Sequence, residues 1–283
     1  MIEFENLFYT YPCSQKPTIN NLSLHIKEGK RYGLIGNNGS GKTTFLRLAN
    51  GLYQPSKGVV SSYGKPLKYD RQSLKLWYQR VGLVFQDPEQ QLVATTVEED
   101  LSYGLCNLGK SNTEISHRVT QTLQDFNLED LAHFPVNYLS LGQKKRLAIA
   151  DVMILKPKIL LLDEPTAYLD PKQRKELIKQ LEHIFQEGTT ILLATHDLDF
   201  IYRWADWIFV MDRGKIALQG TPDEVFEQKE ILEELDLDIP LELKLSKEKS
   251  RVGIAHKKVT LRHLWRVKIK YKILYKVTNC YSS

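Results

Sequence analysis

Residues 36–44 read Gly-Asn-Asn-Gly-Ser-Gly-Lys-Thr-Thr and match the pattern G-x-x-x-x-G-K-[ST]. At this spacing, glycines let consecutive backbone N–H groups curl around a phosphate. The Lys42 ammonium can neutralise the outer phosphates, and the Thr43 hydroxyl can ligate Mg²⁺. An apolar run at 32–35 precedes the motif and a helical pattern follows it, so we expect a nucleoside triphosphate to bind here. The expected contacts are Gly36, Asn37, Asn38, Gly39, Ser40, Gly41, Lys42, Thr43 and Thr44.

Two further polar clusters follow apolar runs. Residues 159–162 lead into Asp163 and Glu164, and residues 191–195 lead into His196. Ligands of an open parallel sheet bind outside the carboxyl ends of its strands, so these clusters should meet the phosphate loop at one edge. Two adjacent carboxylates after a buried strand need a cation or partner; Asp163 can serve Mg²⁺ and Glu164 can polarise an attacking water. By residue type alone, His196 is equally well read as a structural histidine.

Hydrophobic periodicity and turn residues indicate the segments that must position these side chains. In the first third we expect strands at 3–11, 22–26, 32–35 and 81–85, and a helix at 44–50 closed by Gly51.

Residues 95–155 are predicted to be mostly helical, with one capping pattern at Thr96 and Glu99 and another beginning at Asn112 or Thr113. The last third alternates between strands at 159–162, 190–194 and 207–211 and helices at 171–186 and 198–204. This alternation predicts an α/β fold with a mainly parallel sheet covered by helices on both faces. There is one phosphate loop and no internal repeat, so the chain supplies one nucleotide cassette.

Composition narrows the class of protein. The chain has 283 residues and 42% apolar content, enough for a proper core. It has no run of about 18 apolar residues and no basic segment followed by an apolar one at its start, so we expect neither secretion nor membrane spanning. Cys13, Cys106 and Cys280 are scattered, which argues against a disulfide framework and a zinc site and fits the cytoplasm.

The basic charge is concentrated in a C-terminal tail. Residues 241–283 carry 12 Lys or Arg and 2 acidic residues, whereas residues 1–240 carry 27 basic and 32 acidic ones. Residues 266–273 alternate basic and apolar, which favours an extended strand over a helix. Such a tail suits anionic lipid and would also attract nucleic acid; it could equally be a terminus that catalysis does not need.

Several ordered motifs resemble those of the ATP-binding subunits of ABC transporters. Residues 139–143, Leu-Ser-Leu-Gly-Gln, resemble the LSGGQ signature and stand upstream of residues 161–166, Leu-Leu-Asp-Glu-Pro-Thr. Further matches are Gln86 to the Q-loop, residues 167–170 to the D-loop, His196 to the switch histidine and Tyr11 to the aromatic residue that stacks on adenine.

The resemblance implies a P-loop fold of the ABC ATPase type, with an N-terminal antiparallel β subdomain and a helical signature subdomain at about 95–155. We expect this domain to span residues 1–230, with a C-terminal extension at 231–283. In the family, two cassettes pack head to tail and bind ATP between the P-loop of one and the signature of the other. The resemblance thus places Ser140, Gly142 and Gln143 on the nucleotide in trans.

The resemblance also implies roles for single residues. Thr43, Gln86 and Asp163 would surround Mg²⁺, Glu164 would be the catalytic carboxylate, and His196 would contact the γ-phosphate. The partner is then a second copy or a paralogue, with a transmembrane coupling subunit and a substrate-binding membrane subunit at the cytoplasmic face of the membrane. No nucleic acid is expected as a partner.

The sequence departs from the family pattern at three positions. Leu141 replaces the first glycine of LSGGQ, which is tolerable only if position 141 does not need a positive φ. Tyr168 stands where the D-loop often has a small residue, and Asp151 where a neutral residue is common; neither has a functional interpretation from the sequence.

Weaker motifs favour a subgroup. Residues 86–92, 96–100, 143–146 and 220–226 resemble the energy-coupling ATPases of bacterial importers for cobalt, nickel or vitamins. The alternatives are an ATPase of another ABC importer or exporter, or an ABC-superfamily ATPase that acts on translation or nucleic acid. A DNA-repair ATPase would need a long coiled coil before Ser140, and a translation factor normally carries two cassettes. A small-molecule kinase has no use for the signature.

Overall fold

The computed structural model describes residues 1–245 and contains two β-sheets. The smaller sheet is antiparallel, in the order β2-β1-β4-β5. Its strands are β1 (Ile2–Tyr9), β2 (Ile19–Ile26), β4 (Lys57–Ser62) and β5 (Lys65–Pro66). This is the N-terminal antiparallel subdomain that the resemblance implied.

The larger sheet has the strand order β10-β9-β3-β8-β7-β6 and is parallel except for β10, which runs antiparallel to β9. Its strands are β3 (Arg31–Ile35), β6 (Val81–Val84), β7 (Ile159–Asp163), β8 (Thr190–Ala194), β9 (Trp207–Asp212) and β10 (Lys215–Gly220). The predicted mainly parallel sheet is confirmed.

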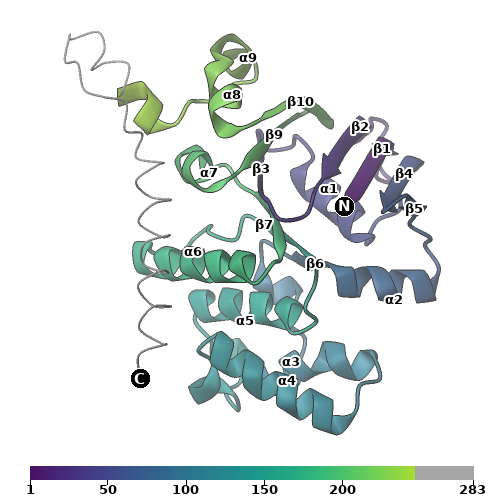
Figure 1. Cartoon of the computed structure of the whole chain (residues 1–283), viewed down its shortest axis with the longest axis vertical. Coiled ribbons are helices and arrows are strands. Elements are labelled where there is room, and N and C mark those ends of the chain that lie inside the picture. The colour runs from purple at the N-terminus through teal and green to yellow at the C-terminus, as the bar shows by residue number, and fades with distance from the viewer. Residues whose placement is uncertain (246–283) are drawn as a thin grey trace, which may run out of the picture.

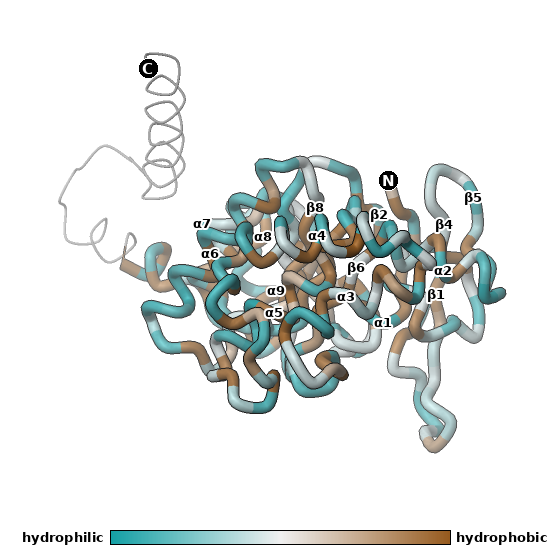
Figure 2. Tube along the Cα trace, turned by 90° about the horizontal axis from the view of Figure 1, so that it is seen from below, coloured by the Kyte–Doolittle hydropathy of each residue, from teal (hydrophilic) through white to brown (hydrophobic). Residues whose placement is uncertain are grey.

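Both faces of the larger sheet are covered. In Figure 1, α5 (Leu141–Met153), α6 (Pro171–Gln186) and α7 (Leu198–Trp204) lie on one side, and α1 (Lys42–Asn50) lies on the other with the small sheet. Alternate residues of β7 enter the two cores: Leu160 and Leu162 pack on the first side, and Leu161 packs on the second. Burial on both faces explains why the strands read as continuous apolar runs. Figure 2 shows the hydrophobic residues gathered where these layers meet.

The remaining helices complete the layers. The helical region at 95–155 consists of α3 (Val97–Asn107), α4 (Asn112–Asp125) and α5, with the 3₁₀ turns η2 (Glu129–Leu131) and η3 (Val136–Tyr138) between α4 and α5. The sequence did not predict α2 (Arg71–Arg80), η1 (Pro88–Gln90), α8 (Pro222–Glu227) or α9 (Lys229–Glu234).

Local hydrogen bonds set the element boundaries, and several differ from the prediction. Strand β1 ends at Tyr9 because Pro12 lies in a turn in which the N–H of Ser14 bonds to the carbonyl of Tyr11. Strand β6 ends before Phe85, whose N–H donates to Oε1 of Gln91 instead of to the ladder.

Local hydrogen bonds also set where the helices begin. Helix α1 begins two residues early, at Lys42, because its first backbone bond runs from Phe45 to the carbonyl of Gly41. The capping pattern predicted to begin at Asn112 or Thr113 is wrong, because the N-cap of α4 is Ser111. The capping box of Thr96 with Glu99 and the left-handed cap at Gly51 are confirmed.

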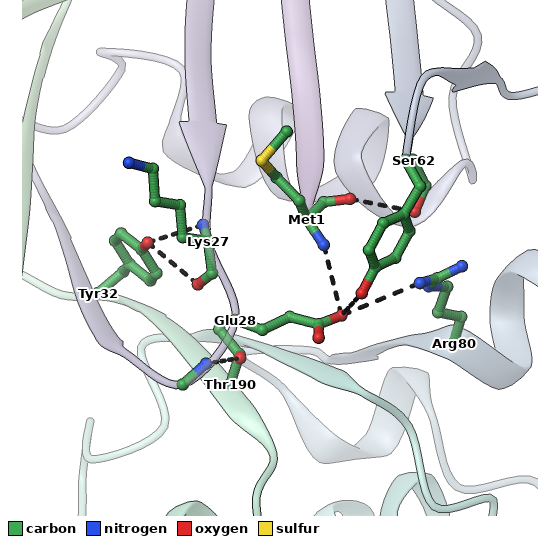
Figure 3. Close-up of polar contacts among 9 residues, drawn as sticks. Met1, Lys27, Glu28, Tyr32, Ser62, Arg80 and Thr190 are labelled. Carbon is green, nitrogen blue, oxygen red and sulfur yellow. Dashed lines mark hydrogen bonds and ion pairs between the residues drawn. The ribbon is translucent and has the colours of Figure 1, made fainter.

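A polar cluster around Glu28 joins the two sheets (Figure 3). The Glu28 carboxylate accepts hydrogen bonds from the N-terminal ammonium (3.4 Å) and from the Tyr63 hydroxyl (2.5 Å), and Arg80 lies 3.9 Å away. The next residue, Gly29, donates its N–H to Oγ1 of Thr190 on β8 (2.8 Å). The antiparallel subdomain is thus tied to the sheet that carries the phosphate loop.

Within residues 1–245, no helix has the length and apolar character needed to cross a bilayer. The predicted basic strand of the tail lies outside the described residues.

Candidate functional site

The phosphate loop connects β3 to α1, and its glycines are needed for its shape. Gly36 has a φ of +152°, and a Cβ there would lie 2.2 Å from the Met211 carbonyl oxygen. Gly41 has a φ of +106°, and a Cβ there would lie 3.0 Å from the Thr18 carbonyl oxygen. Both conformations are left-handed and both positions are crowded, so a side chain would deform the loop.

Two polar side chains of this loop are positioned to bind a phosphate. Nζ of Lys42 folds back onto the carbonyls of Gly36 (2.7 Å) and Asn37 (3.2 Å). Burial lowers the pKa of Lys42, while the charges of Glu164 and Asp163 act in the opposite direction. In the part of the chain that the structure describes, the buried Ser40 hydroxyl has no hydrogen-bond partner. A phosphate would satisfy both groups.

Thr43 and Asp163 form the expected oxygen pair at the carboxyl edge of the sheet. The Thr43 hydroxyl donates to Oδ2 of Asp163 over 2.7 Å. Burial raises the pKa of Asp163, whereas the hydrogen bond from Thr43 lowers it. A hydroxyl and a carboxylate are the hard oxygen ligands that Mg²⁺ prefers, so the donor set fits this ion.

Glu164 is held in a well-defined pose between the ends of β7 and β8. It is 8% exposed, Oε2 accepts from the Thr195 hydroxyl (3.1 Å), and Oε1 lies 3.0 Å from Nδ1 of His196. The His196 side chain is mostly exposed. The structure therefore pairs the two residues in one subunit. Sequence reasoning missed Thr195, although its position at the end of the apolar run leading to His196 was an available signal.

Gln86 follows the end of β6, and Tyr11 lies beside the start of α1. Gln86 is exposed and follows β6, whose Val84 pairs with Leu162 immediately before Asp163. The Tyr11 hydroxyl lies 3.1 Å from Oγ1 of Thr44, within hydrogen-bonding distance at the start of α1, and its ring packs edge-on against Tyr9 and Tyr53. Tyr11 is thus fixed beside the phosphate loop.

The signature forms the start of α5. Ser140 is the N-cap: its Oγ accepts from the N–H of Gln143 (3.4 Å), and Oε1 of Gln143 accepts from the N–H of Ser140 (2.8 Å). Leu141 is the first helical residue and does not have a positive φ, so the leucine is compatible with this backbone. Gly142 faces α6, where a Cβ would lie 2.7 Å from Cδ of Gln173.

The signature does not meet the phosphate loop of the same chain. A cleft of about 300 Å³ beside Ser140 is lined by residues of α5 and α6 and of the segment before α6, and by no residue of 36–44. Figure 1 shows α5 well apart from α1. The structure thus brings together the phosphate loop, Asp163, Glu164 and His196, and leaves Ser140, Gly142 and Gln143 on a separate surface. A helix N-terminus on that surface suits an anion presented by another molecule.

A phosphate loop after a parallel strand, an oxygen pair for a divalent cation and a buried carboxylate beside a histidine define a P-loop nucleoside triphosphatase. The family model described as ABC transporter matches residues 19–167. The chain belongs to this family as an ATP-binding subunit: it is an ABC ATPase, an enzyme that hydrolyses ATP to drive transport.

Relatives place the chain within the family. It is 56% identical over 240 residues to a putative ABC transporter ATP-binding protein of Nostoc sp., covering 85% of this chain and 88% of the relative. It is 40% identical over 240 residues to the energy-coupling factor transporter ATP-binding protein EcfA of Methanosphaera stadtmanae, covering 85% and 86%.

Solved structures of ABC transporter cassettes are similar to this chain in fold. CbiO1 of Clostridium perfringens, part of the ABC transporter complex CbiONQ, superposes with a TM-score of 0.73 at 37% identity, covering 89% of this chain and 98% of that one. The cassette MJ0796, solved as a dimer in a post-hydrolysis state with ADP and Pi, gives 0.71 at 28% identity, covering 78% and 99%.

Proposed function

We propose that this chain binds and hydrolyses ATP to energise an importer of the energy-coupling-factor type, carrying cobalt or nickel ions or a vitamin, and that it works at the cytoplasmic face of the membrane. One observation carries the proposal: Glu164 is held between Thr195 and His196 at the edge where Thr43 meets Asp163, while the signature faces away. This arrangement supplies a complete hydrolytic half-site and a separate surface that can complete another.

The residues of the half-site divide the work. Tyr11 would stack on adenine, and Lys42 with the backbone N–H groups of residues 36–44 would hold the phosphates. Glu164 orients and polarises the attacking water, and His196 contacts the γ-phosphate. Thr43, Asp163 and Gln86 would hold Mg²⁺, which when bound neutralises charge on the phosphates.

In a head-to-tail dimer of two copies, or of this chain and a paralogue, each subunit supplies the signature that completes the ATP site of the other. The N-terminus of α5, with Ser140, Gly142 and Gln143, would contact the γ-phosphate bound by the partner's loop. The dimeric state of the related cassette with ADP and Pi supports this assembly. Closure of the dimer on ATP then moves the membrane subunits, and hydrolysis restores the open form.

The segment after β6 is the proposed docking site for the transmembrane coupling subunit. Oε1 of Gln91 accepts from the N–H of Phe85, and its Nε2 donates to the carbonyl of Ala148 on α5 (2.6 Å). This side chain links the segment that begins with Gln86 to the signature helix. Its position supports coupling between the membrane subunit and the γ-phosphate contact.

Replacement of Glu164 by Gln tests the hydrolytic role. The amide cannot act as a base, so we expect ATP hydrolysis to fall by at least about a hundredfold while ATP binding persists and a dimer accumulates with ATP. Phosphate release and size-exclusion chromatography measure the two effects. Glu187→Gln, at an exposed site on the far end of α6, is the matched control. Hydrolysis at the wild-type rate by Glu164→Gln would refute the role.

Complementation tests the shared site. Lys42→Ala disables the phosphate loop, and Ser140→Ala disables the signature contact, so each variant alone should hydrolyse ATP poorly. A mixture restores one intact site if the loop of one subunit works with the signature of the other. If the mixture gains no activity, a site shared between subunits is excluded.

Co-purification from membranes in mild detergent identifies the transmembrane partners. Uptake of cobalt, nickel and vitamins by cells carrying the Glu164→Gln subunit then tests the substrate class. Partners typical of an exporter would overturn the importer assignment.

A further inference from the structure

Lys145 is a buried lysine on the signature helix with an unusual pair of partners. It is 5% exposed, and its Nζ donates to the backbone carbonyls of Glu164 (3.3 Å) and Pro165 (3.1 Å). Its sequence neighbours point elsewhere: Lys144 pairs with Glu89, and Arg146 contacts Asn127 and Glu176. Of three consecutive basic residues, only the middle one reaches the turn that carries the proposed catalytic carboxylate.

The backbone of this turn is strained at Glu164, the proposed catalytic carboxylate. Glu164 has a φ of +44°, a left-handed conformation that is unfavourable for a residue other than glycine. Its N–H donates to the carbonyl of Ala194 (2.9 Å), and its own carbonyl accepts from the N–H of Ala167 (3.1 Å). The bond from Lys145 is a charge-assisted addition to this carbonyl, so it favours the left-handed conformation over relaxed alternatives.

Packing alone does not explain a lysine here. Burial disfavours the charged ammonium and lowers the pKa of Lys145 to about 8, while the charges of Glu164 and Asp87 act in the opposite direction. An apolar side chain of the same length would fill the space without this cost. The buried charge is therefore retained at a cost to stability, and its hydrogen bonds fall on the turn at Glu164.

We propose that Lys145 is a positioning residue for ATP hydrolysis: it fixes the backbone of Glu164 and ties that carboxylate to the signature helix of the same subunit. Ser140 caps the start of this helix, five residues before Lys145. Contact of Ser140 with the partner's nucleotide would therefore be transmitted through α5 to the catalytic turn of its own subunit. The inference rests on the proposed role of Glu164 and adds a link between the two sites of the dimer.

Two substitutions in the full-length protein test this role. Lys145→Met keeps the length and loses the donors, so kcat is expected to fall about tenfold or more while the KM for ATP stays within about twofold. Lys145→Gln keeps N–H donors without the charge, so its kcat is expected to lie between that of Lys145→Met and that of the wild type. Lys75→Met, an exposed helical lysine on α2, is the matched control.

The pH profile adds a readout that a purely structural role would not move. Wild-type kcat is expected to decline as pH rises through about 8, where the ammonium loses its proton, and this decline should be absent in Lys145→Gln. If Lys145→Met does not fold, the reduced kcat and the flattened pH profile of Lys145→Gln still decide the question.

The outcomes separate this inference from the proposed function. Wild-type kcat in folded Lys145→Met, or an unchanged pH decline in Lys145→Gln, would overturn the positioning role. If Glu164→Gln abolishes hydrolysis in the same assays, the proposed function survives that result. Wild-type hydrolysis by Glu164→Gln would instead refute the proposed function itself.

Discussion

Asp151 should make the protein less stable as pH rises, and replacing it with Asn should remove that effect. Asp151 lies on α5, where burial and the nearby charge of Asp100 raise its pKa to about 7. Asp100 is 1% exposed; its Oδ1 accepts from two backbone N–H groups, and its Oδ2 has no partner within residues 1–245. The side chain of Gln91 reaches Oδ2 of Asp151 at 3.5 Å, too far to offset these costs.

Proton linkage sets the direction and the size of the effect of Asp151 on stability. The folded state keeps the Asp151 proton to about pH 7, whereas the unfolded chain loses it near the ordinary value of 3.8. Between these values the folded state binds more protons, so stability falls as pH rises and stays reduced above pH 7. The rise in the pKa of Asp151 from 3.8 to about 7 lowers the free energy of unfolding by about 4 kcal/mol above pH 7, at about 1.4 kcal/mol per pH unit.

Urea unfolding at pH 4.5 and pH 8 measures the effect. The free energy of unfolding of Asp151→Asn should exceed that of the wild type by only about 1 kcal/mol at pH 4.5 and by about 4 kcal/mol at pH 8. Asp130→Asn, at an exposed position, controls for the loss of one negative charge. Equal stability of Asp151→Asn and wild type at pH 8 would show that the folded state does not hold the proton.

Two further predictions concern the scaffold of the phosphate loop. Arg31 lies 2.9 Å from the buried Glu182 carboxylate, and Arg31→Met leaves that carboxylate without its cation. The free energy of unfolding in urea should therefore fall by about 3 to 5 kcal/mol. A change below about 1 kcal/mol would contradict this prediction. Gly36→Ala drives a Cβ into the Met211 carbonyl and should weaken ATP binding at least about tenfold by calorimetry. Gly104→Ala, whose Cβ would make ordinary contacts with Leu155 at 3.6 Å, should bind ATP normally.

Some elements of this fold are determined by neighbouring residues alone. The helix at 171–186 and the strand at 190–194 were predicted to the residue, because a continuous apolar run, a cap and a 3.6-residue period are properties of neighbouring residues. Predicted boundaries were wrong where a group outside the regular hydrogen-bond pattern took over a backbone bond. At Phe85, for example, the side chain of Gln91 replaces the strand partner.

The phosphate loop, the order of the motifs and the carboxylates at strand ends were determined by the sequence alone, since spacing along the chain fixes which strand end each residue occupies. The tertiary structure decided the rest. It gave Glu164 a left-handed backbone whose carbonyl accepts from Lys145, and a carboxylate that accepts from Thr195. It also set the signature apart from the phosphate loop. These features depend on contacts between residues far apart in the chain, and local propensity does not encode such contacts.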